Sequence, residues 1–168
     1  LVSNAGVVAT DTTGVGTARS YLAATEFGAD KGIFGYGANG SDLSITNLVS
    51  NAGVVATDTT GVGTARGGLS ACSFGEDKAI FAYGGSVTAI SNLVSNTGVV
   101  ATDVTGVGTA RHSLAACEFG QDKGIFAYGY DSPTFYSVSN LVSNTGVVAT
   151  DVTGVGTARF GLEGCSYN

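Results

Sequence analysis

The sequence has no methionine or tryptophan, a single proline, a single histidine and few charged residues, which make up 12% of its 168 positions. Its longest apolar runs are four to six residues, far short of the roughly 20 that a membrane-spanning helix requires, so we expect no membrane insertion. The lone histidine, His112, has no repeated partner, and no Cys-x-x-Cys pair is present. We therefore expect no catalytic residue, no cofactor and no metal site.

Basic residues are also scarce: seven Lys and Arg stand against thirteen Asp and Glu, for a net charge of −6. All seven bases recur at repeated positions, where seven repeated acids balance them. The net charge therefore comes from six acids at positions that do not repeat, namely Glu26, Asp42, Glu76, Glu118, Asp131 and Glu163. A variable surface that gains only acids repels phosphate backbones, so we expect no nucleic-acid partner.

Glycine is abundant, with 27 residues, and together with the many Val, Thr, Ser and Ala residues it favours an all-β fold. The segment 1–19, LVSNAGVVATDTTGVGTAR, recurs almost unchanged from Leu48, Leu93 and Leu141, at spacings of 47, 45 and 48 residues. A period of this length is typical of a modular array in which each unit buries its apolar face against the next.

One repeat, taken from Arg111, contains four strand signals separated by turn residues. The expected strands are 114–119, 124–129, 139–143 and 147–152. Gly and Asp in 120–123 and Gly in 144–146 supply the turns. Four short antiparallel strands in 45–48 residues are the unit of a β-propeller blade, and the small Ala-Ala-Cys residues place the first strand innermost. A parallel β-solenoid is the alternative, but four separate turn signals in each repeat count against it.

The repeats divide the chain into one partial blade, three complete blades and the first strand of a further blade, about three and a half blades in all. The predicted boundaries are 1–19, 20–66, 67–111, 112–159 and 160–168. Since the pattern opens in mid-blade, we interpret the chain as part of a longer propeller. A small ring completed by a second copy is the alternative.

The run Thr-Ala-Arg-x-x-Leu-Ala-Ala, followed by Phe-Gly-x-Asp-Lys-Gly-Ile-Phe-Ala-Tyr-Gly and a variable loop, resembles the kelch repeat. The resemblance covers the whole chain and implies a β-propeller. The chain departs from it in keeping the glycine pair only at Gly84-Gly85 and in lacking the usual Trp. Repeats of the chromosome-condensation-regulator type are a weaker match. The near-identical copies in this chain also resemble the kelch-like arrays encoded by bacteriophage and environmental viral genomes, and this resemblance implies a virion-surface or extracellular location.

Other repeated residues are expected to be structural. Cys72, Cys117 and Cys165 occupy one repeat position and are interpreted as small buried residues rather than disulfide partners. Pairs of the Asp11–Arg19 type are expected to tie blade to blade, and Asp30-Lys31 to form a solvated turn. Gly14-Val-Gly16 looks like a dinucleotide loop, but it recurs four times before a strand, which indicates a turn between blades.

Variation among the repeats concentrates in the pair after each Arg and in the loop after each second strand, which an up-and-down blade places at one face. The candidate binding residues there are Tyr21, Asp42, His112, Tyr130, Asp131, Phe135, Tyr136 and Phe160. Aromatic rings beside short polar side chains suit a glycan or protein surface. Three alternatives are loops that contact no ligand, a structural fibre subunit that self-associates, and a galactose-oxidase-like enzyme, which one histidine disfavours.

Overall fold

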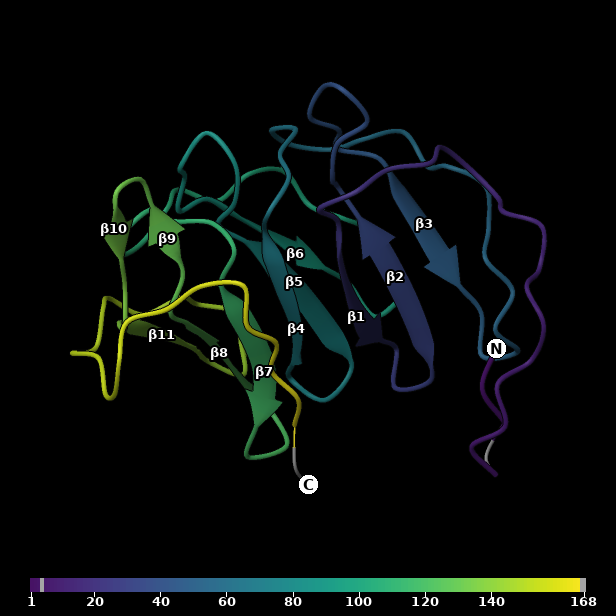
Figure 1. Ribbon diagram of the computed structural model, residues 1–168. Coiled ribbons are helices and arrows are strands. Elements are labelled where there is room, and N and C mark those ends of the chain that lie inside the picture. Colours follow the sequence, from purple (N-terminus) through teal and green to yellow (C-terminus); the bar gives the residue numbers. More distant parts are fainter. Residues whose placement is uncertain (4, 167–168) are drawn as a thin grey trace.

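The computed structural model describes residues 1–3 and 5–166 and shows an all-β protein with four small antiparallel sheets and no helix in that part of the chain (Figure 1). Three sheets are three-stranded and one is a short hairpin. Their strands are β1 (Ala23–Phe27), β2 (Lys31–Gly35) and β3 (Thr46–Val49); β4 (Ser70–Phe74), β5 (Lys78–Ala82) and β6 (Ser91–Val94); β7 (Ala115–Phe119), β8 (Lys123–Ala127) and β11 (Ser139–Val142); and the hairpin β9 (Tyr130–Asp131) and β10 (Thr134–Phe135).

None of the described residues belongs to a helix long and apolar enough to cross a bilayer.

The three larger sheets share one register, which pairs Thr25 with Ile33 in the first sheet, Cys72 with Ile80 in the second and Cys117 with Ile125 in the third. The first three strands expected for a repeat are therefore present, with ends shifted by at most two residues in the third repeat. The short β9–β10 hairpin lies within what the sequence predicted to be an irregular loop.

The fourth strand, predicted at 147–152, is not a continuous strand. It touches β11 only through isolated bridges, at Val148 and Val152. The reason is visible at Asn140, whose side-chain amide donates to the carbonyl of Ala149 at 3.0 Å. A side chain thus takes the place of part of the backbone ladder, and Val147 projects into solvent.

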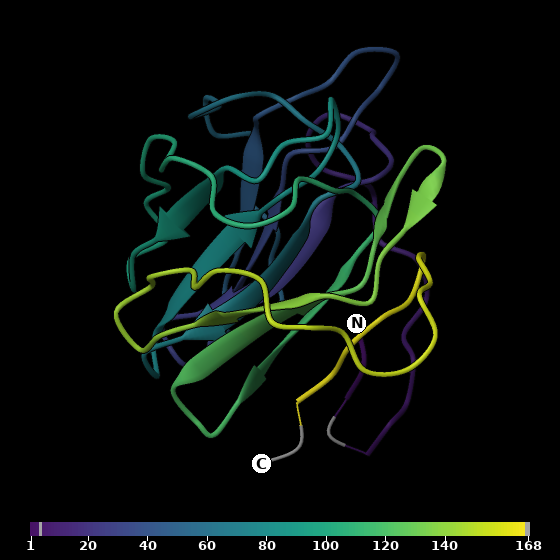
Figure 2. The same cartoon turned by 90° about the vertical axis from the view of Figure 1, so that its left-hand side faces the viewer.

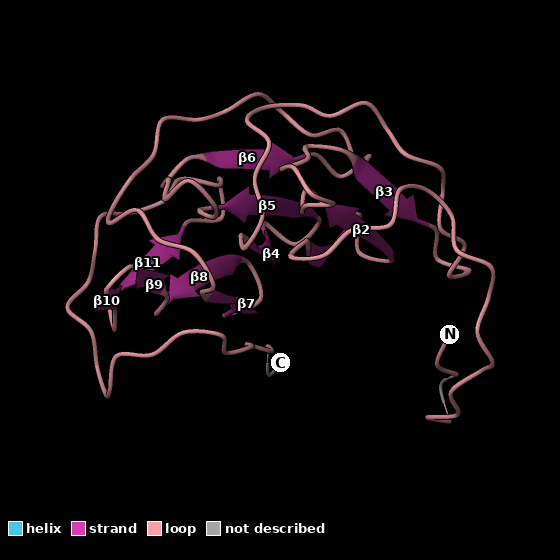
Figure 3. Ribbon diagram, turned by 45° about the horizontal axis from the view of Figure 1, so that its top comes forward, coloured by secondary structure: helices cyan, strands magenta, loops and turns pink. Residues whose placement is uncertain are grey.

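The three large sheets follow one another around an open arc, and the two chain ends lie at its open side (Figure 3). The first strands of successive sheets are neighbours: β1 lies beside β4, and β4 lies beside β7. Small Ala and Cys residues in these strands allow the close approach. The contacts agree with a first strand on the inner side of each sheet.

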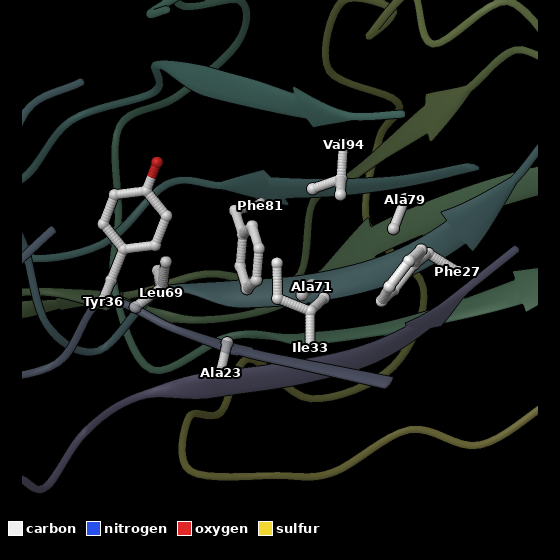
Figure 4. Close-up of a cluster of buried hydrophobic side chains, with 9 residues drawn as sticks. All are labelled: Ala23, Phe27, Ile33, Tyr36, Leu69, Ala71, Ala79, Phe81 and Val94. Atoms are coloured by element: carbon white, nitrogen blue, oxygen red, sulfur yellow. The ribbon is translucent and has the colours of Figure 1, made fainter. Parts of the chain in front are cut away.

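Two hydrophobic cores fill the spaces between the sheets, and both use the same repeat positions. One face of each core is a Phe, an Ile and a Tyr, and the other is a Leu, a Phe and a Val. In the first core these are Phe27, Ile33 and Tyr36 against Leu69, Phe81 and Val94 (Figure 4); in the second they are Phe74, Ile80 and Tyr83 against Leu114, Phe126 and Val142. The repeat thus encodes one interface that the chain forms twice.

Candidate functional site

A buried arginine at the start of each new sheet fixes the position of the variable segments that follow it. Arg66 is fully buried and donates to the carbonyls of Tyr83 and Thr64, at 2.8 and 3.0 Å, and to the side-chain oxygen of Asn92 at 2.8 Å. Its guanidinium lies 4.3 Å from the ring centroid of Tyr36 in the preceding sheet. The arginine therefore satisfies three acceptors in its own sheet while stacking on its neighbour.

Arg111 repeats this arrangement in the third sheet. It donates to the carbonyls of Tyr128 and Thr109 and to Asn140, and it stacks on Tyr83 at 4.3 Å. Burial lowers the pKa of Arg111 and raises that of Tyr83, because a low-dielectric surrounding disfavours each charged form. The arginine still carries its charge at neutral pH, so both junctions are held by charge-assisted hydrogen bonds.

An aspartate in the outer segment completes each junction, and here the structure corrects the expected pairing of Asp11 with Arg19. Arg19 lies instead beside Asp58 of the next repeat, with 3.8 Å between Nη1 and Oδ1. Asp58 accepts from the backbone N–H and hydroxyl of Thr17, and from Asn47 at 2.8 Å. The expected tie between units exists, but it joins an Arg to the Asp about 40 residues later, through Thr and Asn.

These hydrogen bonds set the ionisation of the aspartates. The hydroxyl of Thr17 and then the amide of Asn47 hold the pKa of Asp58 below its ordinary value. Burial raises the pKa of Asp103, but hydrogen bonds from Thr64 and Asn92 outweigh that effect, so its pKa is also lowered. The aspartates are therefore ionised and act as hydrogen-bond acceptors at neutral pH.

The two variable regions of each repeat are bonded directly to one another. The backbones of Ser20 and Ala38 exchange two hydrogen bonds, as do those of His112 and Tyr130, while the N–H of Gly85 donates to the carbonyl of Gly67. The segments that differ most between repeats are thus brought to the same place in each unit, next to the buried arginine. This is the location that the sequence indicated for a binding face.

Four of the eight candidate residues form one aromatic cluster, three from the third repeat and one, Phe160, from the segment that follows it. The rings of Tyr130, Phe135 and Phe160 lie 5.0–5.5 Å apart between centroids, with tilts of 30–40°. His112 meets the Tyr130 ring edge-on at 5.4 Å. We call these four residues the aromatic cluster; Phe135 and Phe160 are 49% and 51% exposed.

The β9–β10 hairpin builds this cluster, since Tyr130 and Phe135 are paired across it and Asp131 lies beside them in the same hairpin. Figure 2 shows the hairpin projecting beyond the sheet, with the yellow C-terminal segment that carries Phe160 running close to it. The Nδ1 atom of His112 is 2.9 Å from the hydroxyl oxygen of Ser113. An apolar surface with polar groups at its rim results.

The other candidates lie outside the cluster. Tyr21 is highly exposed, with a φ of 54°, and its carbonyl accepts from the N–H of Gly68 at 2.9 Å. Tyr21 and Asp42 both approach Gly67, at the junction of the first two sheets. Tyr136 follows the hairpin and its N–H donates to the carbonyl of Gly129. The structure therefore separates the predicted face into two patches.

The nearly invariant turns lie at the other end of the strands. Their Asp side chains accept from an Asn of the same repeat, as in Asn51 to Asp30 at 3.0 Å and Asn96 to Asp77 at 2.9 Å. Asp30 and Lys31 pair in an exposed turn, as expected. Each turn also bonds to the next, for example from the N–H of Gly28 to the carbonyl of Asp77 at 2.7 Å. This end serves to join the units.

The three cysteines are free and differ in environment. Cys72 is buried, Cys117 is half-buried and Cys165 is exposed, so the interpretation as small buried residues is right for Cys72 and wrong for Cys165. Burial raises the pKa of the Cys72 thiol to about 12. Within residues 1–3 and 5–166, no group of three or more His, Cys, Asp and Glu side chains is placed to hold a metal ion.

The sequence reasoning missed the asparagine that bridges Arg to Asp, although its signal was present. Asn47, Asn92 and Asn140 recur at one position, just before each Leu-Val-Ser-Asn run. A polar residue repeated in the middle of an apolar strand indicates a satisfied buried group.

The chain matches no family model and no curated protein.

Proposed function

We propose that the chain is a kelch-like β-propeller segment without catalytic activity, and that it recognises a ligand surface through the aromatic cluster. Three successive sheets with one shared register, adjacent first strands and a repeated core support the propeller interpretation. Each sheet, together with its bridged outer segment, corresponds to one blade. The resemblance to viral arrays supports an extracellular or virion-surface location.

The observation that carries the recognition role is the half-exposed set of rings on a rigid support. Tyr130, Phe135 and Phe160 form a continuous apolar surface, and two of them leave about half of their area in water. The buried Arg111 directly precedes His112 and donates to the carbonyl of Tyr128, two residues before Tyr130. Function commonly resides in such variable loops on a fixed scaffold.

The chemistry at the rim favours a glycan. Flat rings stack against the apolar faces of sugars, while the Asp131 carboxylate and the Ser113 hydroxyl offer short hydrogen-bonding groups beside them. The cluster has no Lys or Arg side chain of its own, which disfavours acidic and phosphorylated ligands. A protein surface with an apolar patch is the second candidate, since the exposed rings are also typical interface anchors.

Glycan and peptide arrays probed with the purified chain test this role. We expect Tyr130→Ala and Phe135→Ala to weaken binding to the best array ligand by about tenfold or more, because each removes a stacking ring. The matched control is Tyr21→Gly, which removes an exposed aromatic outside the cluster and installs the residue that the second repeat has at that position, Gly68. Binding that survives both cluster substitutions, or that Tyr21→Gly reduces equally, would contradict the assignment.

A further inference from the structure

The variable loop of the first repeat carries the one Asn-Gly pair of the sequence, Asn39-Gly40. The loop is a tight hairpin that is closed by a bridge between Ala38 and Asp42, and all of residues 39–42 are exposed to solvent. The corresponding loops of the second and third repeats contain no asparagine. The pair therefore belongs to the variable face and not to the repeated framework.

An asparagine followed by glycine can lose its side-chain amide without an enzyme. The backbone nitrogen of the glycine attacks the side-chain carbonyl carbon, ammonia leaves, and a cyclic succinimide forms. Water then opens the ring to aspartate or to isoaspartate, so the net reaction consumes water, releases ammonia and needs no oxidant or cofactor. Glycine favours this reaction because it has no Cβ to hinder closure of the ring.

The structure leaves both reacting groups of this pair free to meet. Within residues 1–3 and 5–166, neither the N–H of Gly40 nor the side chain of Asn39 takes part in a hydrogen bond. A Cβ built on Gly40 would have no neighbouring atom within 4 Å, so the loop has space for the ring. Because the two groups belong to consecutive residues, the attack is intramolecular and pays no cost of association.

The scaffold protects the other asparagines that the structure describes. The framework asparagines are buried, and each side-chain amide is bonded to an Arg, to an Ala carbonyl and to an Asp; these residues are Asn47, Asn92 and Asn140. The turn asparagines are exposed, but each amide donates to an Asp; these residues are Asn51, Asn96 and Asn144. All of them are followed by Leu, Ala or Thr, whose Cβ hinders ring closure.

We propose that Asn39 is a site of spontaneous deamidation, which changes the charge of the variable face as the protein ages. The new carboxylate lies in the same loop as Asp42, whose own carboxylate approaches Gly67 in the second repeat. The patch formed by Tyr21 and Asp42 thus gains a negative charge, in a chain whose net charge is already −6. The modified patch repels acidic partners more strongly, whereas the aromatic cluster lies outside it.

The isoaspartate product also changes the backbone, because it inserts an extra methylene into the main chain of the hairpin. Ala38, at the base of this hairpin, exchanges two backbone hydrogen bonds with Ser20, at 2.8 and 2.9 Å. These bonds join the two variable regions of the first repeat. The modification therefore acts on the geometry of this patch as well as on its charge.

Peptide mapping of the native chain after incubation at neutral and mildly alkaline pH tests the site, with an unincubated sample as the background. Tryptic cleavage after Lys31 and Arg66 gives the peptide 32–66, which holds Asn39 together with its controls Asn47 and Asn51. We expect Asn39 to convert about tenfold or more faster than Asn51, which corresponds to a difference of about 1.4 kcal/mol in the barrier. Its rate should rise with pH, because base removes the proton of the attacking N–H.

Two variants identify the product. Asn39→Gln keeps an exposed amide on a longer side chain that closes a ring far more slowly, so it should develop no acidic form on ion-exchange chromatography. Asn39→Asp should elute with the aspartate product of the aged wild type. The proposal is overturned if Asn39 stays intact in the native chain, if Asn47 or Asn51 converts first, or if Asn39→Gln turns acidic as fast as the wild type. Conversion of Asn39 in the urea-unfolded chain alone would show that the fold protects it, contrary to the proposal.

Discussion

Replacement of Arg66 by Met tests whether the buried arginines hold successive sheets together. The substitution keeps the approximate length of the side chain but removes all three hydrogen bonds of its guanidinium, to Tyr83, Thr64 and Asn92. Three buried acceptors then lose their donor, and the Tyr36 ring loses its cation. Breaking a buried, charge-assisted network of this kind costs about 3–5 kcal/mol.

That loss is a large part of the stability available to a chain of this size, which is about 5–15 kcal/mol. For a protein of this length it corresponds to a fall in Tm of about 6–20 °C. Thermal and urea denaturation, followed by circular dichroism, measure both quantities.

The matched control is Arg159→Met, at the same repeat position. Arg159 is exposed and, within the described part of the chain, donates only to the carbonyl of Thr157, besides stacking on Tyr128. Its replacement should cost less than about 1 kcal/mol, because water satisfies the groups it leaves. Equal losses in the two variants, or an unchanged Tm for Arg66→Met, would refute the role given to the buried network.

Two further predictions concern the same junctions, and a third concerns the cysteines. The pKa of Asp103 is lowered in the folded protein, so its ionised carboxylate stabilises the fold. This stabilisation is complete above the pKa of the unfolded state, about 4, and is lost as the pH falls through the pKa of the folded state. Asp103→Asn should therefore make Tm less sensitive to acid below about pH 4, and an unchanged dependence of Tm on pH would count against this. In Gly108→Ala the new Cβ would lie 2.4 Å from a carboxylate oxygen, whereas Gly156 has nearly the same φ and no close contact. By urea denaturation, Gly108→Ala should therefore destabilise the fold by about 1–3 kcal/mol more than Gly156→Ala. Equal losses of stability in the two variants would contradict the close packing at Gly108. An alkylating reagent followed by mass spectrometry should label exposed Cys165 in the native state and buried Cys72, whose thiol pKa is raised to about 12, only on unfolding; early labelling of Cys72 would disprove its burial.

The repeat made much of the fold predictable, because each strand signal occurs several times and has to satisfy the same interface. Strands such as β7 and β8 lie within two residues of the expected bounds. The prediction of a fourth strand was wrong because the β-branched residues of 147–152 are typical of a strand, while the structure holds this segment through the Asn140 side chain and isolated bridges. Periodicity does not reveal that a side chain replaces a ladder bond.

The placement of the variable segments was predictable, but the grouping of their side chains was not. Comparison of the repeats predicted that His112 and Tyr130 lie at one face, and in the structure their backbones are joined by hydrogen bonds. The contact of Phe135 and Phe160 with Tyr130 depends on the β9–β10 hairpin and on the path of the C-terminal segment, neither of which follows from local sequence. The pairing of Arg19 with Asp58 was missed because it links residues about 40 positions apart.

The central claim is that the repeated residues build a scaffold and that the aromatic cluster binds the ligand. Its most direct test is an NMR titration of the isotope-labelled chain with the strongest binder from the glycan and peptide arrays. The account predicts that chemical-shift changes concentrate at Tyr130, Phe135 and Phe160, while the turn containing Asp30 stays unchanged. Changes centred on the repeated turns, or arrays that yield no binder at all, would contradict it.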